Sequence, residues 1–237
     1  MQSIEFLVGV FEFVLLLFSL SFHECAHAWM ASRLGDQTAR LQGRVTLNPM
    51  YHVDPVGTLL IPALGIFGPL IGLGFLGGVL IGWAKPTPVI SRNFRKIKRD
   101  ENLVTLAGPV SNLLLVAISV VLLLVVAHAA PGGRHIVVST FHGGLLTGVG
   151  SGLQAVVLLA VLAIEVNLSL FFFNLLPVPP LDGSRLLANA LPYNAMQAYY
   201  RIPLWVSWML MIFVGGAILR MFIGPALGLV YFVLTHV

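Results

Sequence analysis

The chain has 237 residues, of which 58% are hydrophobic and only 9% are charged, and its formal net charge is +4. A soluble domain carries about 25% charged residues, so this composition excludes an ordinary soluble protein and predicts an integral membrane protein. A positive net charge can indicate an anionic partner. In a membrane protein it more simply reflects basic cytoplasmic loops, and we expect no nucleic-acid partner.

Five apolar blocks follow one another along the chain, at residues 4–34, 56–83, 103–127, 151–176 and 203–234. A helix crosses a membrane with about 20 apolar residues, so the first, third, fourth and fifth blocks are predicted spans. The fifth is interrupted by Gly224-Pro225. The second contains Pro62, Pro69 and many glycines, which favours a broken or re-entrant hairpin packed against protein. The sequence therefore predicts an all-α polytopic protein with about four to six membrane segments.

The basic residues indicate how the chain is oriented. Six lie between residues 84 and 100, and Arg33, Arg40 and Arg44 follow the first block, whereas the connector at residues 128–150 contains only Arg134. By the positive-inside rule the first two connectors are cytoplasmic and the third is not. Both can be cytoplasmic only if the second block enters and leaves on the same side, which places the N-terminus outside.

The two cytoplasmic connectors contain short segments that are not helical in character. Residues 44–47, Arg-Val-Thr-Leu, alternate polar and apolar side chains and predict a short strand. Residues 83–90 contain Pro86 and Pro88 and predict extended chain. We therefore expect a short β element near the cytoplasmic face.

The first block leads into His23-Glu24-Cys25-Ala26-His27, an H-E-x-x-H pattern. On a helix the two histidines face the same side and can bind one zinc ion, and the glutamate can act as general base toward a water on that ion. His23 lies about 28 Å along the helix from Ile4, which places the site toward the cytoplasmic end of the span. The pattern predicts metal-dependent hydrolysis at a bilayer.

A catalytic zinc site needs a third protein ligand and an open position. Asp182 follows the fourth block in a proline-rich turn, and an ionisable residue at the end of an apolar span is expensive without a cation. Asp182 could instead cap a short helix. His52 and Asp54 are alternative ligands, although a role in ordering their loop through hydrogen bonds explains them as well.

Three motifs in this order resemble the site-2 protease family of intramembrane zinc metalloproteases. They are the H-E-x-x-H pattern, Gly108-Pro109-Val110-Ser111-Asn112, and residues 174–183. Residues 48–55 and 82–86 also resemble compact bacterial and archaeal members. The resemblance covers roughly residues 22–183 and implies a protease of a bacterial or archaeal cell membrane. Its partners would be the lipid bilayer and a transmembrane protein substrate.

The resemblance also implies roles for individual residues. One zinc ion per chain would be held by His23, His27 and Asp182. Glu24 would activate the water. Asn174 matches an asparagine thought to hydrogen-bond the substrate or the oxyanion, and Asn112 matches the asparagine of the Gly-Pro motif, with a supporting role at the same site.

We expect a single membrane-embedded protease domain over residues 1–237. The catalytic core would occupy about residues 4–190, and a C-terminal membrane segment about residues 203–235. The larger family members carry a PDZ domain or a cystathionine-synthase-like domain, and we expect neither here.

Two other classes of protein share part of this pattern. A non-catalytic zinc-binding regulator or transporter would not need Glu24, because a structural site closes with four protein ligands. A membrane metallopeptidase of the prenyl-protein-processing type would use a glutamate as third ligand, and the only intramembrane glutamate later in the chain is Glu165, far from the cytoplasmic side.

The extended connector offers a hypothesis for how substrate is held. An unwinding substrate could pair with its edge by strand addition, using the backbone amides of Thr87 and Val89. A rigid linker is the alternative explanation for the same residues.

Overall fold

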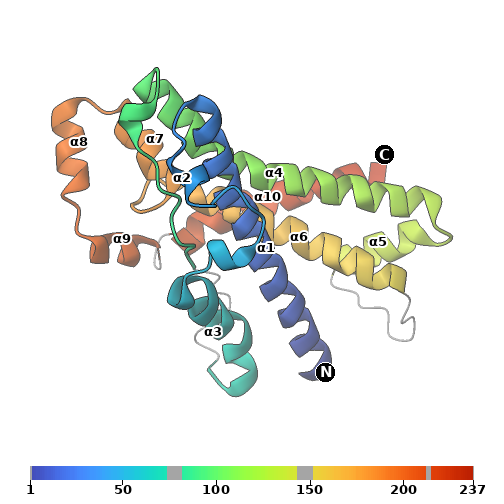
Figure 1. Ribbon diagram of the computed structural model, residues 1–237. Coiled ribbons are helices and arrows are strands. Elements are labelled where there is room, and N and C mark those ends of the chain that lie inside the picture. Colours follow the sequence, from blue (N-terminus) through green and yellow to red (C-terminus); the bar gives the residue numbers. More distant parts are fainter. Residues whose placement is uncertain (1, 74–81, 143–151, 212–214, 237) are drawn as a thin grey trace.

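The computed structural model describes residues 2–73, 82–142, 152–211 and 215–236, and every regular element in these ranges is helical (Figure 1). Within them, four helices are long and apolar enough to cross a membrane. They are α1 (Gln2–Leu34), α4 (Ile97–Ala129), α6 (Gly152–Asn174) and α10 (Gly216–His236). This confirms an all-α polytopic membrane protein.

The predicted strand at residues 44–47 is wrong. Among the described residues no segment pairs with these four as a second strand, and their backbone bends instead. The buried Arg44 side chain donates to the carbonyls of Tyr51 and Lys85, at 2.5 and 3.3 Å. Arg44 therefore turns inward to bind loop carbonyls, and the alternation of polar and apolar residues does not reflect the two faces of a strand.

The second apolar block is a broken helix over its described part. A π-helical turn (Pro55–Leu60) leads into α3 (Ile61–Phe67) and a short 3₁₀ turn (Gly68–Ile71). The block extends into residues 74–81, which lie outside the described residues. The prolines and glycines thus shorten the helical segments, as the composition indicates.

The predicted interruption at Gly224-Pro225 is also wrong, because α10 continues through Pro225. Proline is tolerated inside spanning helices when neighbouring groups satisfy the backbone. The fifth block contains α9 (Leu204–Leu210) and α10, which begins at Gly216, and residues 212–214 between them lie outside the described residues.

Four short helices occupy the connectors. They are α2 (Thr38–Leu41), α5 (Gly133–Phe141), α7 (Asp182–Ala190) and α8 (Tyr193–Tyr200). Among these, α5 packs against α4 and α6.

Helix α4 forms the centre of the packing, with α1 and α6 as its main neighbours (Figure 1). A large apolar cluster joins α4, α5, α6 and α10. A smaller one joins Leu16 and Leu20 of α1 to Val166 and Leu170 of α6. Because α1 contacts both α4 and α6, side chains on its inner face meet groups from two other long helices.

The loop after α1 is tied to the distant connector by one carboxylate. Gly35 has a φ of +116°, which favours glycine, and it leads into the buried Asp36. Asp36 accepts hydrogen bonds from the Ile90 amide at 2.7 Å and the Asn93 side chain at 2.8 Å. Burial alone would raise the pKa of Asp36, but these hydrogen bonds and those from Thr38 hold it below its usual value.

We therefore predict that Asp36→Asn destabilises the folded protein at pH 7 by about 1–3 kcal/mol. A lowered folded-state pKa adds stability above the ordinary aspartate pKa, and this contribution is lost as the pH falls through the folded-state value. The thermal midpoints of wild type and variant, measured in detergent, should differ at pH 7, and the difference should shrink as the pH falls from about 4 through the lower folded-state pKa. Glu101→Gln is the control, because the Glu101 side chain has no hydrogen bond or ion pair with the described residues. Equal midpoints at pH 7 would contradict the prediction.

Candidate metal centre

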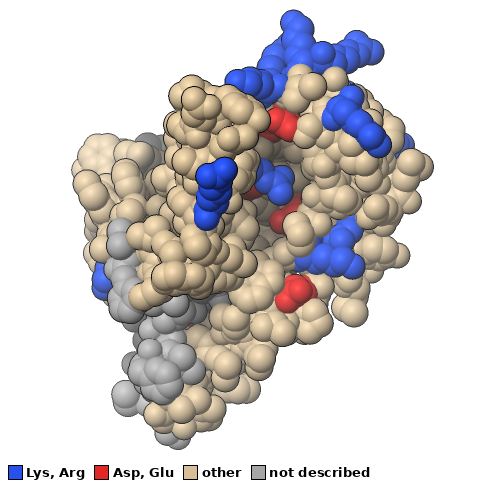
Figure 2. Space-filling view, turned by 90° about the vertical axis from the view of Figure 1, so that its left-hand side faces the viewer, with Lys and Arg blue, Asp and Glu red and all other residues tan. Residues whose placement is uncertain are grey.

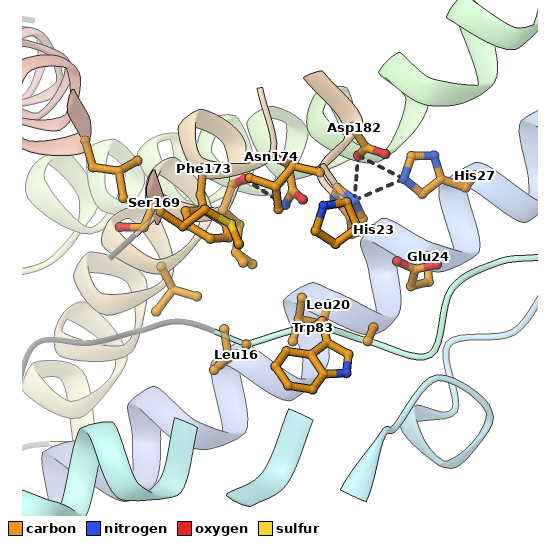
Figure 3. A pocket seen from close by; sticks show the side chains of 18 of the residues that line it. Leu16, Leu20, His23, Glu24, His27, Trp83, Ser169, Phe173, Asn174 and Asp182 are labelled. Atoms are coloured by element: carbon orange, nitrogen blue, oxygen red, sulfur yellow. Dashed lines mark hydrogen bonds and ion pairs between the residues drawn. The ribbon is translucent and has the colours of Figure 1, made fainter. Parts of the chain in front are cut away.

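Three potential metal ligands from two helices lie together (Figure 3). His23 and His27 lie one turn apart on α1, with their Nε2 atoms 3.0 Å from each other. Asp182, the first residue of α7, places Oδ2 at 3.1 Å from Nε2 of His23 and 3.2 Å from Nε2 of His27. The structure thus brings together the three residues that the sequence singled out as zinc ligands, although Asp182 lies 155 positions after His27 in the chain.

The spacing of these atoms fits a zinc ion. Ligand atoms at about 2.0–2.1 Å from a tetrahedral zinc are about 3.3 Å apart, close to the 3.0–3.2 Å observed. Two imidazoles and one carboxylate are also the donor set of many catalytic zinc sites. The residues present therefore fit a zinc ion with one coordination position left for water or substrate.

The other ring nitrogen of each histidine is held by an acceptor. His27 Nδ1 lies 2.7 Å from the carbonyl oxygen of Val104, and His23 Nδ1 lies 2.7 Å from Oδ1 of Asn112. Both acceptors belong to α4, and each requires a hydrogen on Nδ1. The two Nε2 lone pairs are consequently free to bind a metal.

Asn112 belongs to a chain of polar groups that crosses the helix core. Its amide donates to Oδ1 of Asn167 on α6 at 2.9 Å, and the Asn167 amide donates to the Ser19 hydroxyl at 3.0 Å and the Ala163 carbonyl at 2.8 Å. Asn112 is fully buried and does not line the cavity beside the metal ligands. The structure places it behind His23, where it orients the ring, and not in the position expected for a group that contacts substrate or oxyanion.

Gly108 lets α4 approach the metal ligands. A Cβ atom at this position would lie 2.3 Å from Nε2 of His27 and 2.5 Å from Nε2 of His23. Neither ring can easily move away, because its Nδ1 is hydrogen-bonded to α4 itself. Glycine is therefore required at position 108 for steric reasons, because any side chain would collide with the histidine rings.

Asp182 is positioned by the tight turn between α6 and α7. A Cβ at Gly183 would lie 2.2 Å from the carbonyl oxygen of Leu175, so the start of α7 packs directly on the end of α6. Burial opposes ionisation of Asp182, but the two adjacent imidazoles hold the pKa of its carboxyl well below the usual range. Asp182 is the first residue of α7, but the N-cap is Leu181 and no side chain caps the helix, so the alternative that Asp182 serves as the cap is wrong.

Glu24 contacts the extended connector that follows the second block. Its Oε2 atom accepts from the Thr87 amide at 3.0 Å and from the Thr87 hydroxyl at 2.8 Å. The hypothesis that the Thr87 amide is free to pair with substrate is therefore wrong, because Glu24 already occupies that donor. Val89 lies on the cavity wall, and its amide has no hydrogen-bond partner in the described part of the chain.

A cavity of about 720 Å³ opens onto these groups. Its lining includes Asn174, and most of the other lining residues are apolar. They come from α1, α6 and α10, among them Leu16, Leu20 and Phe173, and from the connector at residues 82–89 (Figure 3). The charged side chains in the lining are Glu24, Asp182, Arg185 and Arg220. Acidic and basic side chains gather around a hollow on one face of the molecule (Figure 2).

His52 and Asp54 lie outside the group of metal ligands. His52 Nε2 lies 2.9 Å from the Thr46 carbonyl oxygen, and Asp54 accepts from the amides of Val56 and Gly57 at 3.0 and 2.7 Å. Both residues order their loop, which is the alternative explanation that the sequence allowed.

Sequence analysis did not predict four contacts that build the site. Ser19 accepts from Asn167, Asn167 accepts from Asn112, Thr87 donates to Glu24, and Gly108 lies close to both histidine rings. The one available signal was polarity inside apolar blocks, which marks Ser19 and Asn167 as groups that need partners.

Comparison with known proteins identifies the family. The family model described as Peptidase family M50 matches residues 11–214. YwhC of Bacillus subtilis is 40% identical over 179 residues, which cover 76% of this chain and 68% of YwhC. Rip2 of Mycolicibacterium smegmatis is 35% identical over 178 residues, 74% of this chain and 56% of Rip2. Rip2 of Mycobacterium tuberculosis is 33% identical over 177 residues, with the same two coverages.

All three relatives are provisionally named zinc metalloproteases. The chain thus spans just over half the length of the Rip2 proteins that it matches. No solved structure matches it significantly.

The lack of room for a side chain at Gly108 leads to a prediction that can be tested without an activity assay. In an open helix position Gly→Ala would stabilise by about 1 kcal/mol. Here Gly108→Ala should displace both histidine rings and weaken zinc binding by about 10–100-fold, as judged by competition with a chelator. Val110→Ala is the matched control, because Val110 lies two residues away and is exposed. Unchanged zinc affinity together with a raised thermal midpoint would show that the position is open.

Proposed function

This chain belongs to peptidase family M50, the site-2 protease family of metalloproteases, and on that basis we propose that it cleaves peptide bonds within the membrane. Its substrates are membrane proteins, cut in or near a transmembrane segment. The observation that carries the proposal is the group formed by His23, His27 and Asp182. Glu24 lies beside this group, on the wall of an apolar cavity between helices long enough to span a membrane.

The residues of the site have separate tasks in this reaction. His23, His27 and Asp182 would hold one zinc ion, which would supply a Lewis acid for the scissile carbonyl and the attacking water. Glu24 takes a proton from the attacking water and later passes it to the leaving amine. The Nδ1–H groups of the two imidazoles donate to the Asn112 side chain and the Val104 carbonyl of α4, which fixes the tautomer and the orientation of both rings.

Asn174 is the candidate donor to the oxyanion. It lies on the cavity wall, and its side-chain amide has two N–H groups, of which one donates to the Leu170 carbonyl at 2.9 Å. The second N–H is available to the oxygen that becomes negatively charged in the transition state. A preorganised donor of this kind lowers the barrier because it needs no rearrangement during the reaction.

The apolar lining explains the choice of substrate. Amides in a transmembrane helix are hydrogen-bonded and shielded, so a substrate must unwind locally before attack.

The catalytic core is formed by about residues 4–190, and the basic connectors on both sides of the site orient it toward the cytoplasm. Among the described residues no fourth His, Cys, Asp or Glu completes the group, which is unlike a structural zinc site.

The first prediction here concerns the metal. Wild type and His52→Ala should each bind about one zinc ion per folded chain, whereas Asp182→Asn should lose most of its zinc because an amide is a poor zinc ligand. Elemental analysis of the purified, folded proteins measures the stoichiometry. Loss of zinc in His52→Ala with retention in Asp182→Asn would reassign the third ligand.

The second concerns the base. Glu24→Gln preserves the size of the side chain but removes the proton acceptor, so kcat should fall by about 10²–10⁴-fold while zinc stays bound. The assay uses a fluorescent single-pass membrane protein that the wild type cleaves in detergent. Wild-type turnover by the zinc-loaded variant is the result that this mechanism cannot accommodate.

A further inference from the structure

We propose that Thr87 is the positioning residue for Glu24: it fixes one carboxylate oxygen with two donors and leaves the other oxygen free for proton transfer. The proposal rests on the proposed function, because it assigns Thr87 a part in the reaction of Glu24. It replaces the hypothesis that the Thr87 amide binds substrate.

The contacts come from both the backbone and the side chain of Thr87. The amide lies 3.0 Å and the hydroxyl 2.8 Å from Glu24 Oε2, and the hydroxyl also lies 3.2 Å from the Glu24 carbonyl oxygen. Thr87 is buried, so water does not compete strongly for these donors. Oε1 of Glu24 has no hydrogen bond or ion pair with any residue that the structure describes, and it is therefore the oxygen available to a water.

A glutamate on a helix surface needs such a partner to act as a base. Its side chain has three rotatable bonds, and ordering it costs conformational entropy. If the binding of substrate had to order the carboxylate in each turnover, part of that cost would appear in the barrier. Donors that hold it beforehand keep it at a productive distance, and a misplacement of about 1 Å can cost about 10²-fold in rate.

The connector is built to hold Thr87 in place. Pro86 and Pro88 flank it, and each fixes its own φ near −65°. On one side the Lys85 amide donates to the His52 carbonyl at 2.8 Å, and on the other the Ile90 amide donates to Asp36 at 2.7 Å. Thr87 is thus anchored from both directions by groups that do not bind the metal.

The arrangement predicts which kinetic constant depends on Thr87. A residue that pairs with substrate contributes to binding, so its loss raises KM. A residue that holds the base contributes only to the chemical step, so its loss lowers kcat with little change in KM.

The test compares Thr87→Val, which has nearly the same shape but lacks the hydroxyl, with Thr87→Ser, which keeps both donors. The probe is a fluorescent single-pass membrane protein that the wild type cleaves and Glu24→Gln does not. We expect kcat of Thr87→Val to fall about 10–100-fold, with KM within about threefold and zinc content unchanged, and Thr87→Ser to retain at least a third of wild-type kcat. Thr58→Val is the matched control, because it removes a hydroxyl that donates to the Trp83 carbonyl of the same connector and accepts from the Asp54 amide, and it removes no contact with Glu24.

Three results would overturn the proposal: wild-type kcat in Thr87→Val, equally slow Thr87→Ser and Thr87→Val, or a raised KM at constant kcat. If Thr87→Val does not fold, Thr87→Ala removes the hydroxyl without adding a second branched methyl and carries the same expectations. Cleavage by Glu24→Gln would instead refute the proposed function, and that outcome is separate because it does not involve Thr87.

Discussion

The site depends on one constraint: polar groups within spanning helices must find partners inside the protein, because lipid offers none. His23 and His27 lie on a helix apolar and long enough to cross a membrane, and their Nδ1 atoms need acceptors. α4 supplies both, and Asn112 requires Asn167 in turn. The hydrogen bonds that fix the imidazoles therefore also fix α1, α4 and α6 relative to one another. Metal binding and helix packing share the same contacts.

These hydrogen bonds also require α4 to lie very close to the two histidines of α1. The Val104 carbonyl and the Asn112 side chain reach the histidines only because Gly108, between them, has no side chain. Pro109 follows and cannot donate the next helical hydrogen bond of α4. Gly183 has the same function at the start of α7, where Asp182 enters the site. Small residues thus let α4 approach the two histidines and let the start of α7 pack on the end of α6 at short distance.

The parts of this structure that could be predicted from sequence are those encoded locally. Apolar length predicted the four long helices, and the i, i+4 spacing on α1 predicted two ligands on one face. Asp182 required the resemblance to a family as well, because nothing near it in sequence indicates its partners. The strand at residues 44–47 failed because its alternation came from an arginine that binds loop carbonyls. The contact between Thr87 and Glu24 could not be predicted, because the two residues are 63 positions apart. The sequence also does not indicate whether a backbone amide already donates a hydrogen bond within the protein.

The direction of Glu24 explains why a connector, and not another helix, holds it. Successive helical residues are turned by about 100°, so Glu24 points about 60° away from His27 and about 100° from His23. α4 covers the histidine face, where it binds both Nδ1 atoms, and α7 brings Asp182 to the same face. The carboxylate lies on the flank that these helices leave to residues 82–90, which also line the cavity. The connector at residues 82–90 both forms part of the cavity wall and holds Glu24. A shift of this connector would therefore move the base and change the rate of the reaction. A substrate that displaced the connector at Thr87 would release Glu24, so productive binding must use the part of the wall that leaves this contact intact.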